Sequence, residues 1–214
     1  MNKFDTTIIG YHGTEIQSAN LILSNSKYNQ SNNEDDWLGS GIYFYDNLEN
    51  AILYNIRKYI NKNKIYPQYT ELKNKTAILV NIIKCKEDEI VDLNEFENLQ
   101  KFLGLWKIFY DRVKNNEEYK KLKLKDGYMI NWLCENTIYF KECKIFKNVF
   151  NLDLRFNRNI SKIFNKKTRI GYNLNQIFIC IVDDSCIKSI ELYKNDYEKE
   201  FEVIKDVTNN ILIG

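Results

Sequence analysis

The chain has 214 residues, a formal net charge of +2 at neutral pH and 44% hydrophobic residues. This length predicts one domain, and the composition predicts a buried core and excludes a chain that is disordered throughout. The near-neutral charge excludes a protein that binds nucleic acid through overall basicity, because any attraction to phosphate would have to be local.

Cysteine and histidine counts limit the chemistry further. The five cysteines are odd in number and no pair has CxxC spacing, which argues against a disulfide framework or a cysteine zinc site and favours reduced thiols. Because His12 is the single histidine, no histidine-rich metal site is expected. No stretch has the hydrophobic length of a signal peptide or a membrane span, so we expect a cytoplasmic protein without a membrane partner.

The first 62 residues predict two strand–helix pairs. Residues 6–11 predict a strand that delivers His12, Gly13 and Thr14 at its end, and the T-x-x-Q form of Thr14–Gln17 predicts a capping box that starts a helix. A polar loop over 24–36 precedes a strand at 42–45. A second capping signal at 46–49 then starts a helix that runs to about Lys62.

The rest of the chain mixes strands and helices. Strands are predicted at 76–84, 90–93, 144–150, 176–182 and 187–193, and helices at about 94–119 and 126–136. There is no regular βαβα order and no GxGxxG motif, which favours an α+β fold over a doubly wound sheet. We expect a single domain over 1–214 with a helical insertion at about 94–136.

His12 and its neighbours are the first candidates for chemistry. A lone histidine is more often structural than catalytic. The predicted turn, however, brings together an imidazole, the Thr14 hydroxyl and the backbone of Gly13, which has no Cβ to block a ligand. These groups can bind a ribose or an amide without a metal.

Two tyrosines are the second candidates. Strand alternation puts Tyr43 and Tyr45 on the same face, and Tyr54 lies about 160° around the following helix from Ile52, away from the predicted core stripe. Tyr54 is then either an ordinary exposed tyrosine or it faces Tyr43 across a slot. In the second case the two rings form walls for a flat heteroaromatic ring.

These segments, in order, resemble a known family. Tyr11–Thr14, Gly41–Phe44 and Tyr54, eleven positions after Tyr43, are similar to the NAD-binding core of the ADP-ribosyltransferases shared by diphtheria-type toxins and poly(ADP-ribose) polymerases. Bacterial relatives with a WLGxGIYF-like segment, some of them linked to phage defence, look closest. The resemblance covers residues 6–60, with a weaker match over 174–183. It implies a split β-sheet core of two small sheets with flanking helices.

The resemblance also implies a role for each matched residue. His12 would bind the adenosine ribose, the Gly13 backbone would bind the nicotinamide carboxamide, and Tyr43 and Tyr54 would sandwich the nicotinamide ring. Thr14, Ser40 and Gly41 would contact NAD with less support. The third motif position, commonly Glu on a late strand, matches Gln176, so that His12, Tyr43 and Gln176 would form the catalytic set. A shift of two residues would place Phe178 there instead.

The departure at Gln176 affects the expected chemistry. Cleavage of the nicotinamide–ribose bond develops positive charge on the sugar, as glycoside cleavage does. A neutral Gln can bind the ribose hydroxyl but stabilises that charge less than Glu does, so we expect transfer of single ADP-ribose units. Asp183 or Glu135 could supply the missing carboxylate.

The leading hypothesis is therefore an NAD-dependent mono-ADP-ribosyltransferase with NAD as cosubstrate and a protein, RNA or DNA acceptor. The family relationship suggests a bacterial toxin or antiphage effector with an antitoxin or immunity partner. The basic stretch over 155–169 is either a solvated face or a surface for an acidic target, and Lys120–Lys125 favours a solvated face. The alternatives are a catalytically inactive NAD or ADP-ribose-binding module and a nucleic-acid-acting toxin; a Cys–His hydrolase ranks last.

Overall fold

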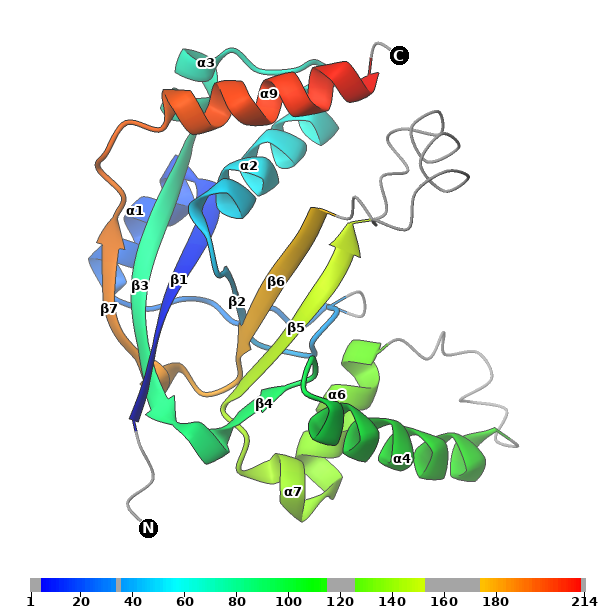
Figure 1. Ribbon diagram of the computed structural model, residues 1–214. Coiled ribbons are helices and arrows are strands. Elements are labelled where there is room, and N and C mark those ends of the chain that lie inside the picture. Colours follow the sequence, from blue (N-terminus) through cyan, green and yellow to red (C-terminus); the bar gives the residue numbers. More distant parts are fainter. Residues whose placement is uncertain (1–4, 34–35, 115–125, 153–173, 213–214) are drawn as a thin grey trace.

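A computed structural model describes residues 5–33, 36–114, 126–152 and 174–212 and has an α+β fold, with helices packed on a mixed seven-stranded sheet (Figure 1). The strands are β1 (Asp5–Glu15), β2 (Ile42–Tyr45), β3 (Thr76–Lys86), β4 (Ile90–Asp92), β5 (Ile145–Leu152), β6 (Leu174–Ile181) and β7 (Ile187–Leu192). The helices are α1 (Ile16–Asn25), α2 (Leu48–Asn63), α3 (Tyr69–Lys75), α4 (Phe96–Val113), α6 (Asp126–Asn136), α7 (Ile138–Lys141) and α9 (Glu198–Leu212), with short 3-10 turns at Glu87–Glu89 and Asp184–Cys186.

Several elements follow the local sequence closely. Strand β2 and helix α6 have the predicted bounds, and α2 begins after Asn47, whose side chain accepts a hydrogen bond from the Asn50 N–H at 2.8 Å. Helix α2 ends where Lys64 adopts a left-handed conformation with φ 62°. Helices α3, α7 and α9 were not predicted, and α4 is shorter than the predicted helix.

The prediction for the end of the first strand was wrong. Strand β1 continues to Glu15, so His12, Gly13 and Thr14 lie inside the strand, and α1 starts without a side-chain cap. The reason is tertiary: β3 pairs with β1 residue by residue, from Asp5↔Lys86 to Glu15↔Thr76. The pairing with β3 extends along the whole of β1, and its hydrogen bonds outweigh the local preference of Thr14 for a capping position.

The order of strands in the sheet is β4-β5-β6-β2-β1-β3-β7. Strands β1 and β2 are joined only at Tyr11↔Tyr45, whereas β1 and β3 pair over all eleven residues of β1. The seven strands therefore form one sheet in which β4-β5-β6-β2 and β1-β3-β7 meet at a single residue pair. The region beyond this pair, where β1 and β2 diverge, is called the split below.

Three hydrophobic clusters pack on the sheet. One contains Ile42 and Phe44 and is covered by α1; the second contains Tyr45 and is covered by α2, α3 and α9. The third lies between α4, α6 and α7 and the β5–β6 side of the sheet, and includes Phe146 and Cys180. Alternation along β2 therefore places its tyrosines opposite Ile42 and Phe44, as predicted.

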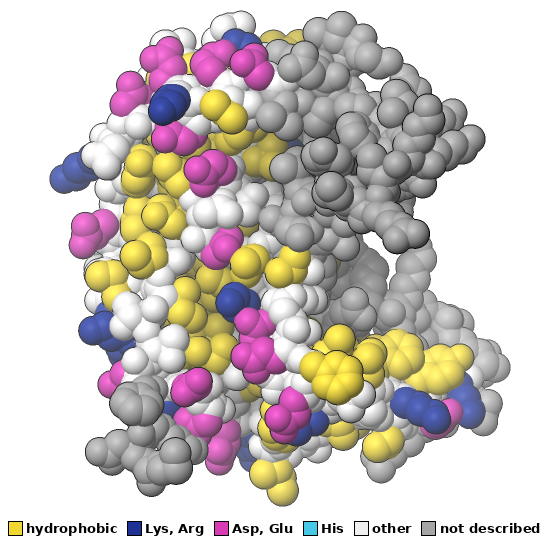
Figure 2. All heavy atoms as spheres, in the orientation of Figure 1, with side chains coloured by type: hydrophobic (Ala, Val, Ile, Leu, Met, Phe, Trp, Pro, Cys, Tyr) yellow, Lys and Arg dark blue, Asp and Glu magenta, His cyan; other side chains and the backbone are white. Residues whose placement is uncertain are grey.

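Hydrophobic side chains are also visible between α9 and α4 on the face drawn in Figure 2. Ile9 on β1 and Ile82 on β3 are neighbours in register and are 53% and 38% exposed. This part of the sheet face is not covered by a helix among the described residues.

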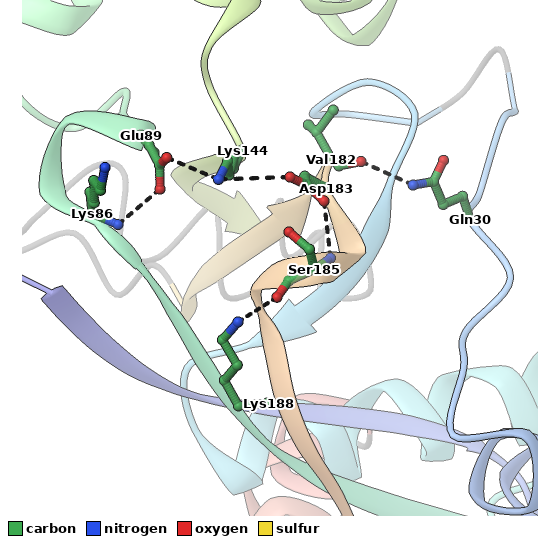
Figure 3. A network of polar contacts seen from close by, with 8 residues as sticks. All are labelled: Gln30, Lys86, Glu89, Lys144, Val182, Asp183, Ser185 and Lys188. Atoms are coloured by element: carbon green, nitrogen blue, oxygen red, sulfur yellow. Dashed lines mark hydrogen bonds and ion pairs between the residues drawn. The ribbon is translucent and has the colours of Figure 1, made fainter.

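Polar groups tie together one end of the sheet, as Figure 3 shows. The ammonium of Lys144 lies 2.9 Å from the Glu89 carboxylate and 3.8 Å from that of Asp183, while Lys188 donates to the Ser185 carbonyl at 2.7 Å. We call this set the Lys144 network. It joins the start of β5 to the ends of β3 and β6.

The predictions about the basic segments and about membrane spans can be compared with the structure only in part. The basic segments 120–125 and 155–169 lie outside the described residues. Within the described residues, no helix combines the length and apolar character that a membrane crossing requires.

Candidate functional site

The split is held open by His12. If the β1–β2 ladder continued past Tyr11↔Tyr45, Gly13 would lie opposite Tyr43. Instead, the Tyr43 carbonyl accepts a hydrogen bond from Nδ1 of His12 at 2.8 Å. A side chain has thus replaced the Gly13 N–H as the donor to Tyr43.

The backbone of Gly13 is left facing the split. Gly13 lies opposite Ile78 on β3, and the Ile78 carbonyl accepts from the Tyr193 N–H at 2.9 Å, so the backbone groups of Ile78 point toward β7. In an antiparallel ladder, two opposed residues either both point toward each other or both point away. The N–H and C=O of Gly13 therefore point toward β2, where no described residue pairs with them. This is an unpaired peptide edge.

The reason for glycine at this position differs from the prediction. A Cβ on Gly13 would lie 2.6 Å from the Ala51 carbonyl oxygen and 2.8 Å from Oδ1 of Asn55. Helix α2 is thus packed directly on β1, and only glycine permits this approach. Gly13 is required by the packing of α2, and the free peptide edge results from the divergence of β2.

His12 is held as a neutral imidazole. Its ring packs edgewise on Tyr28 and Phe44, with ring centroids 5.1 and 5.8 Å away. Burial lowers the pKa of His12 below its ordinary value of 6.5, and the bond to the Tyr43 carbonyl only partly offsets this effect. Because Nδ1 donates to a carbonyl, the neutral ring keeps a lone pair on Nε2 and can accept a hydrogen bond from a ligand hydroxyl.

The imidazole and the tyrosine rings of β2 lie on opposite faces of the sheet. His12 contacts Phe44, whereas Tyr43 and Tyr45 point the other way by strand alternation. A ligand that touches both must therefore extend through the split. This requirement favours a long ligand over a compact one.

An aromatic row crosses the tyrosine face next to the split. The ring centroids are 5.4 Å apart for Trp37 and Phe178, 4.9 Å for Phe178 and Tyr45, and 6.0 Å for Tyr45 and Tyr54. Tyr54 is 39% exposed, as expected for a residue off the core stripe of α2. The ring contact of Tyr54 is with Tyr45, a residue that the sequence did not single out.

Tyr43 is anchored in the loop that precedes β2. Its hydroxyl donates to the Gly39 carbonyl at 2.7 Å and accepts from the Leu38 N–H at 2.9 Å. Burial raises the pKa of this hydroxyl far above its ordinary value. The phenol is thus a fixed neutral group, and a sandwich of a ligand ring between Tyr43 and Tyr54 stays a prediction.

The remaining candidates near β2 have structural partners. The amide of Asn131 on α6 accepts from the Ser40 N–H at 2.6 Å and donates to the Ser40 hydroxyl at 3.0 Å. A Cβ on Gly41 would lie 2.5 Å from the Cys180 sulfur, so glycine is needed where β2 meets β6. Thr14 is buried on β1. The structure does not bring Ser40 to His12, and it gives Gly41 a packing role.

Gln176 is fully buried beyond the end of β2. Its Nε2 donates to Oδ1 of Asn50, in the first turn of α2, at 3.0 Å, while its Oε1 has no partner among the described residues. An unsatisfied buried acceptor costs about 1–3 kcal/mol. Phe178, the alternative for this position, lies two residues away within the aromatic row.

The carboxylate near Gln176 is Asp46, not the two that were considered from the sequence. Burial raises the pKa of the Asp46 carboxyl above its ordinary value, and a backbone hydrogen bond and the charge of Lys147 only partly offset this effect. Asp183 belongs to the Lys144 network after the opposite end of β6, and Glu135 is exposed near the end of α6.

Arg57 adds a positive charge on the face of α2 that carries Asn50 and Tyr54. It lies seven residues, or two helical turns, after Asn50 and three residues after Tyr54. Its guanidinium is half-buried and influences the pKa of Tyr45, and no carboxylate of the described residues lies within ion-pair distance. An unpaired guanidinium suits a phosphate or carboxylate ligand.

The cysteines offer no nucleophile. All five are free; four are buried and Cys134 is partly buried. Burial raises the pKa of the thiols of Cys85 and Cys143 to about 12 and of Cys134 to about 11, which keeps them protonated. The described residues also contain no group of three or more His, Cys, Asp or Glu side chains that could hold a metal ion.

Sequence reasoning missed Tyr45, Asp46, Asn50 and Arg57. A signal was present for the last two, because Asn50, Tyr54 and Arg57 follow the i, i+4, i+7 spacing of one helix face. Their importance depends on the neighbouring strand, which helical periodicity does not reveal.

Comparisons with known proteins give one relative and no family. The chain is 28% identical over 199 residues to an uncharacterized protein of Methanocaldococcus jannaschii, a match that covers 90% of this chain and 89% of the relative. No family model and no solved structure matches the chain. The function must therefore be argued from the site.

Proposed function

We propose that this protein is an NAD-dependent mono-ADP-ribosyltransferase that modifies a macromolecule. The observation that carries the proposal is the unpaired peptide edge of Gly13 in the split. An unpaired N–H and C=O of one residue can bind a primary carboxamide as a neighbouring strand would, and nicotinamide carries this group. The single-pair junction of β1 and β2 is then the counterpart of the split sheet in the family that the sequence resembles.

The other polar groups of the site fit the remainder of NAD. Nε2 of His12 and Oε1 of Gln176, which has no partner among the described residues, can each accept a hydrogen bond from a ribose hydroxyl. The guanidinium of Arg57, which has no ion-pair partner among the described residues, suits the pyrophosphate. Because the His12 ring and the aromatic row lie on opposite faces, a dinucleotide has the length that this site requires.

In this proposal NAD supplies an activated sugar, because its nicotinamide is a cationic leaving group bound to ribose. The protein then has mainly to hold and orient it. Neutral His12 and Gln176 bind hydroxyl groups without adding charge, while the ring of Tyr45 or Tyr54 stacks on the nicotinamide. Since Gln stabilises developing positive charge less than Glu, transfer of single units is expected.

The acceptor is proposed to be a protein, RNA or DNA, and the protein itself a bacterial toxin or antiphage effector with an antitoxin or immunity partner. Support for these points comes only from the family resemblance. The loop around residues 24–36 borders β2 through the Ser31–Gly41 bridge and is suited to contact an acceptor.

Incubation with labelled NAD and cell lysate tests the proposal. The expected result is a label on protein or nucleic acid with release of nicotinamide, lost in His12→Ala and kept in Lys188→Ala, a control in the Lys144 network. Digestion with protease or nuclease identifies the acceptor class. Absence of both labelling and NAD consumption contradicts the proposal.

A second candidate is an inactive NAD or ADP-ribose-binding module. The neutral Gln176 favours it, because this residue replaces the acid that the resemblance leads one to expect. Calorimetry that shows dinucleotide binding without any nicotinamide release would select this function over the first.

A further inference from the structure

We propose that Tyr28 and Asn81 are positioning residues that hold the imidazole of His12 in one orientation. In this orientation Nδ1 donates to the Tyr43 carbonyl, and Nε2 is left to accept a hydrogen bond from a ligand. Tyr28 and Asn81 are buried, whereas His12 is partly exposed. The contacts that hold the ring do not depend on the proposed function, and only the identity of the ligand rests on it.

Asn81 is a fully buried amide inside a hydrophobic cluster. It lies on β3 opposite Gly10, on the same strand face as Leu79 and Ile83, which belong to the cluster that α1 covers. Its NH₂ group donates to the carbonyls of Gly10 and Leu79, each at 3.2 Å. A flipped amide would set its oxygen against two carbonyl oxygens. The backbone of the sheet therefore determines the orientation of Asn81.

The fixed Oδ1 of Asn81 anchors Tyr28. Helix α1 ends at Asn25, and Ser26 then adopts a left-handed conformation with φ 49°, which stops the helix and redirects the chain. Tyr28 is 4% exposed, and its hydroxyl donates to Oδ1 of Asn81 at 2.8 Å. Because Oδ1 can only accept, the hydroxyl proton is used in this bond and is not available to the nitrogen atoms of His12.

The anchored phenol ring restricts the imidazole from one side. The centroids of the His12, Tyr28 and Phe44 rings lie 5.1 to 5.8 Å apart, and the planes of the rings meet at angles of 61° to 81°. Each pair thus packs edge to face. Phe44 is held within strand β2, whereas Tyr28 lies outside any helix or strand. Loss of its hydroxyl bond therefore removes the restraint on one side of the imidazole.

The presence of a buried polar pair here is explained by orientation and not by stability. Two apolar residues of the same shape would keep the fold about as stable, because both polar groups would be absent together. A satisfied buried pair, however, fixes one arrangement of its neighbours. If the imidazole turned, Nδ1 would lose the Tyr43 carbonyl and a ligand hydroxyl would no longer meet the lone pair of Nε2.

The test observes the two ring nitrogens of His12 by nitrogen-15 NMR, and the assignment is direct because the chain has a single histidine. In the wild-type protein we expect separate signals from a protonated Nδ1 and an unprotonated Nε2. Tyr28→Phe keeps the ring but removes the hydroxyl, so the two signals should move toward each other as both tautomers become populated. KM for NAD should rise about fivefold while kcat stays within about twofold, because a contact of bound NAD is weakened.

A second variant separates positioning from stability. Y28F leaves Oδ1 of Asn81 without its donor and should lower the melting temperature, whereas the further change Asn81→Leu removes both polar groups and should restore it. The altered signals and the raised KM should persist in this double variant.

The matched control is Tyr69→Phe. Tyr69 is also buried and its hydroxyl also donates to a side chain, that of Asp196, but it belongs to the cluster covered by α2, α3 and α9. This variant should lower the melting temperature without changing the His12 signals or KM.

Merged signals and a raised KM in Y28F and in the double variant, but not in the control, support the inference. Wild-type signals in Y28F overturn it whatever the activity, and so does a return of the signals to their wild-type positions in the double variant. An active enzyme whose KM is unchanged although its signals merge also overturns it. If Y28F alone does not fold, the double variant decides by the same criteria. If the signals merge as expected but no protein, the wild type included, binds or consumes NAD, the positioning of His12 stands and the proposed function fails.

Discussion

Two polar regions of this protein, at opposite ends of β6, differ in how completely their groups are paired. In the Lys144 network the Lys144 side chain is 34% exposed, and its ammonium lies between two carboxylates (Figure 3). At the split, Gln176 is fully buried, and among the described residues neither its Oε1 nor the Gly13 peptide, beyond the β1–β2 pair, has a partner. Paired, solvated charges join strand ends, whereas buried unpaired groups reduce stability and are expected where a ligand completes the pairing.

The largest expected effect tests this contrast through activity. His12→Ala removes the donor that replaces Gly13 at Tyr43 and is expected to reduce NAD consumption about 100-fold or more, because the split loses its geometry. Lys144→Met in the opposite region should stay within about twofold. Steady-state rates of nicotinamide release measure both. Equal losses in the two variants would mean that the distinction between the regions is wrong.

The second prediction exchanges polar for apolar groups in both regions. Asn50→Leu with Gln176→Met removes the unsatisfied acceptor and its neighbour together, so the free energy of unfolding should stay unchanged or rise by up to about 2 kcal/mol while NAD binding is lost. Glu89→Leu with Lys144→Met should instead lower it, by less than about 1 kcal/mol. Denaturant titration measures the change. A large loss of stability in the first pair would indicate a structural role for Gln176.

The third prediction uses the single histidine. The pKa of His12 in the folded protein is lowered below its ordinary value of 6.5, so below pH 6.5 the unfolded chain binds more protons than the folded one. The free energy of unfolding should fall as the pH decreases from 7.5 to 5.5, with a slope of at most about 1.4 kcal/mol per pH unit. His12→Gln should remove this slope in urea titrations. The same slope in both proteins would contradict a neutral buried imidazole.

The smallest predicted effect concerns Arg57. Arg57→Gln should weaken NAD binding about five- to tenfold, a loss of about 1–1.4 kcal/mol, and leave nicotinamide binding unchanged, because only the dinucleotide carries phosphate. Lys58→Gln is the matched control, since Lys58 is exposed and lies 3.8 Å from Glu15. Calorimetry with both ligands measures the difference. Equal weakening in the two variants would assign the effect to overall charge.

The parts of the fold that the sequence predicted are those that local patterns determine. Strand β2 and helix α2 follow from alternation, from the Asn47 cap and from a regular apolar stripe. Helix α3 has seven residues, too few for helical periodicity to appear. The capping box at Thr14 failed because pairing with β3 extends β1 past it.

The candidate site was predicted only in part for a similar reason. The motif located His12, Gly13 and Tyr54, but the free peptide of Gly13 depends on pairing that runs through β3 to β7. The role of Asn50 depends on Gln176, which is 126 residues away in the chain. Such relations are set by strand order and register, which a single sequence does not encode in any short segment.

The Tyr11–Tyr45 junction has a consequence for how the sheet could evolve or be redesigned. Beyond that pair, β1 and β2 are linked by the hydrogen bond from the His12 imidazole to the Tyr43 carbonyl. In a continued ladder the Gly13 N–H would be the backbone donor to this same carbonyl. An aliphatic residue in place of His12 would leave the Tyr43 carbonyl without this donor, and the β1–β2 ladder could then extend by the pair Gly13–Tyr43. A single substitution at His12 could thus close the split and make the sheet continuous between β1 and β2.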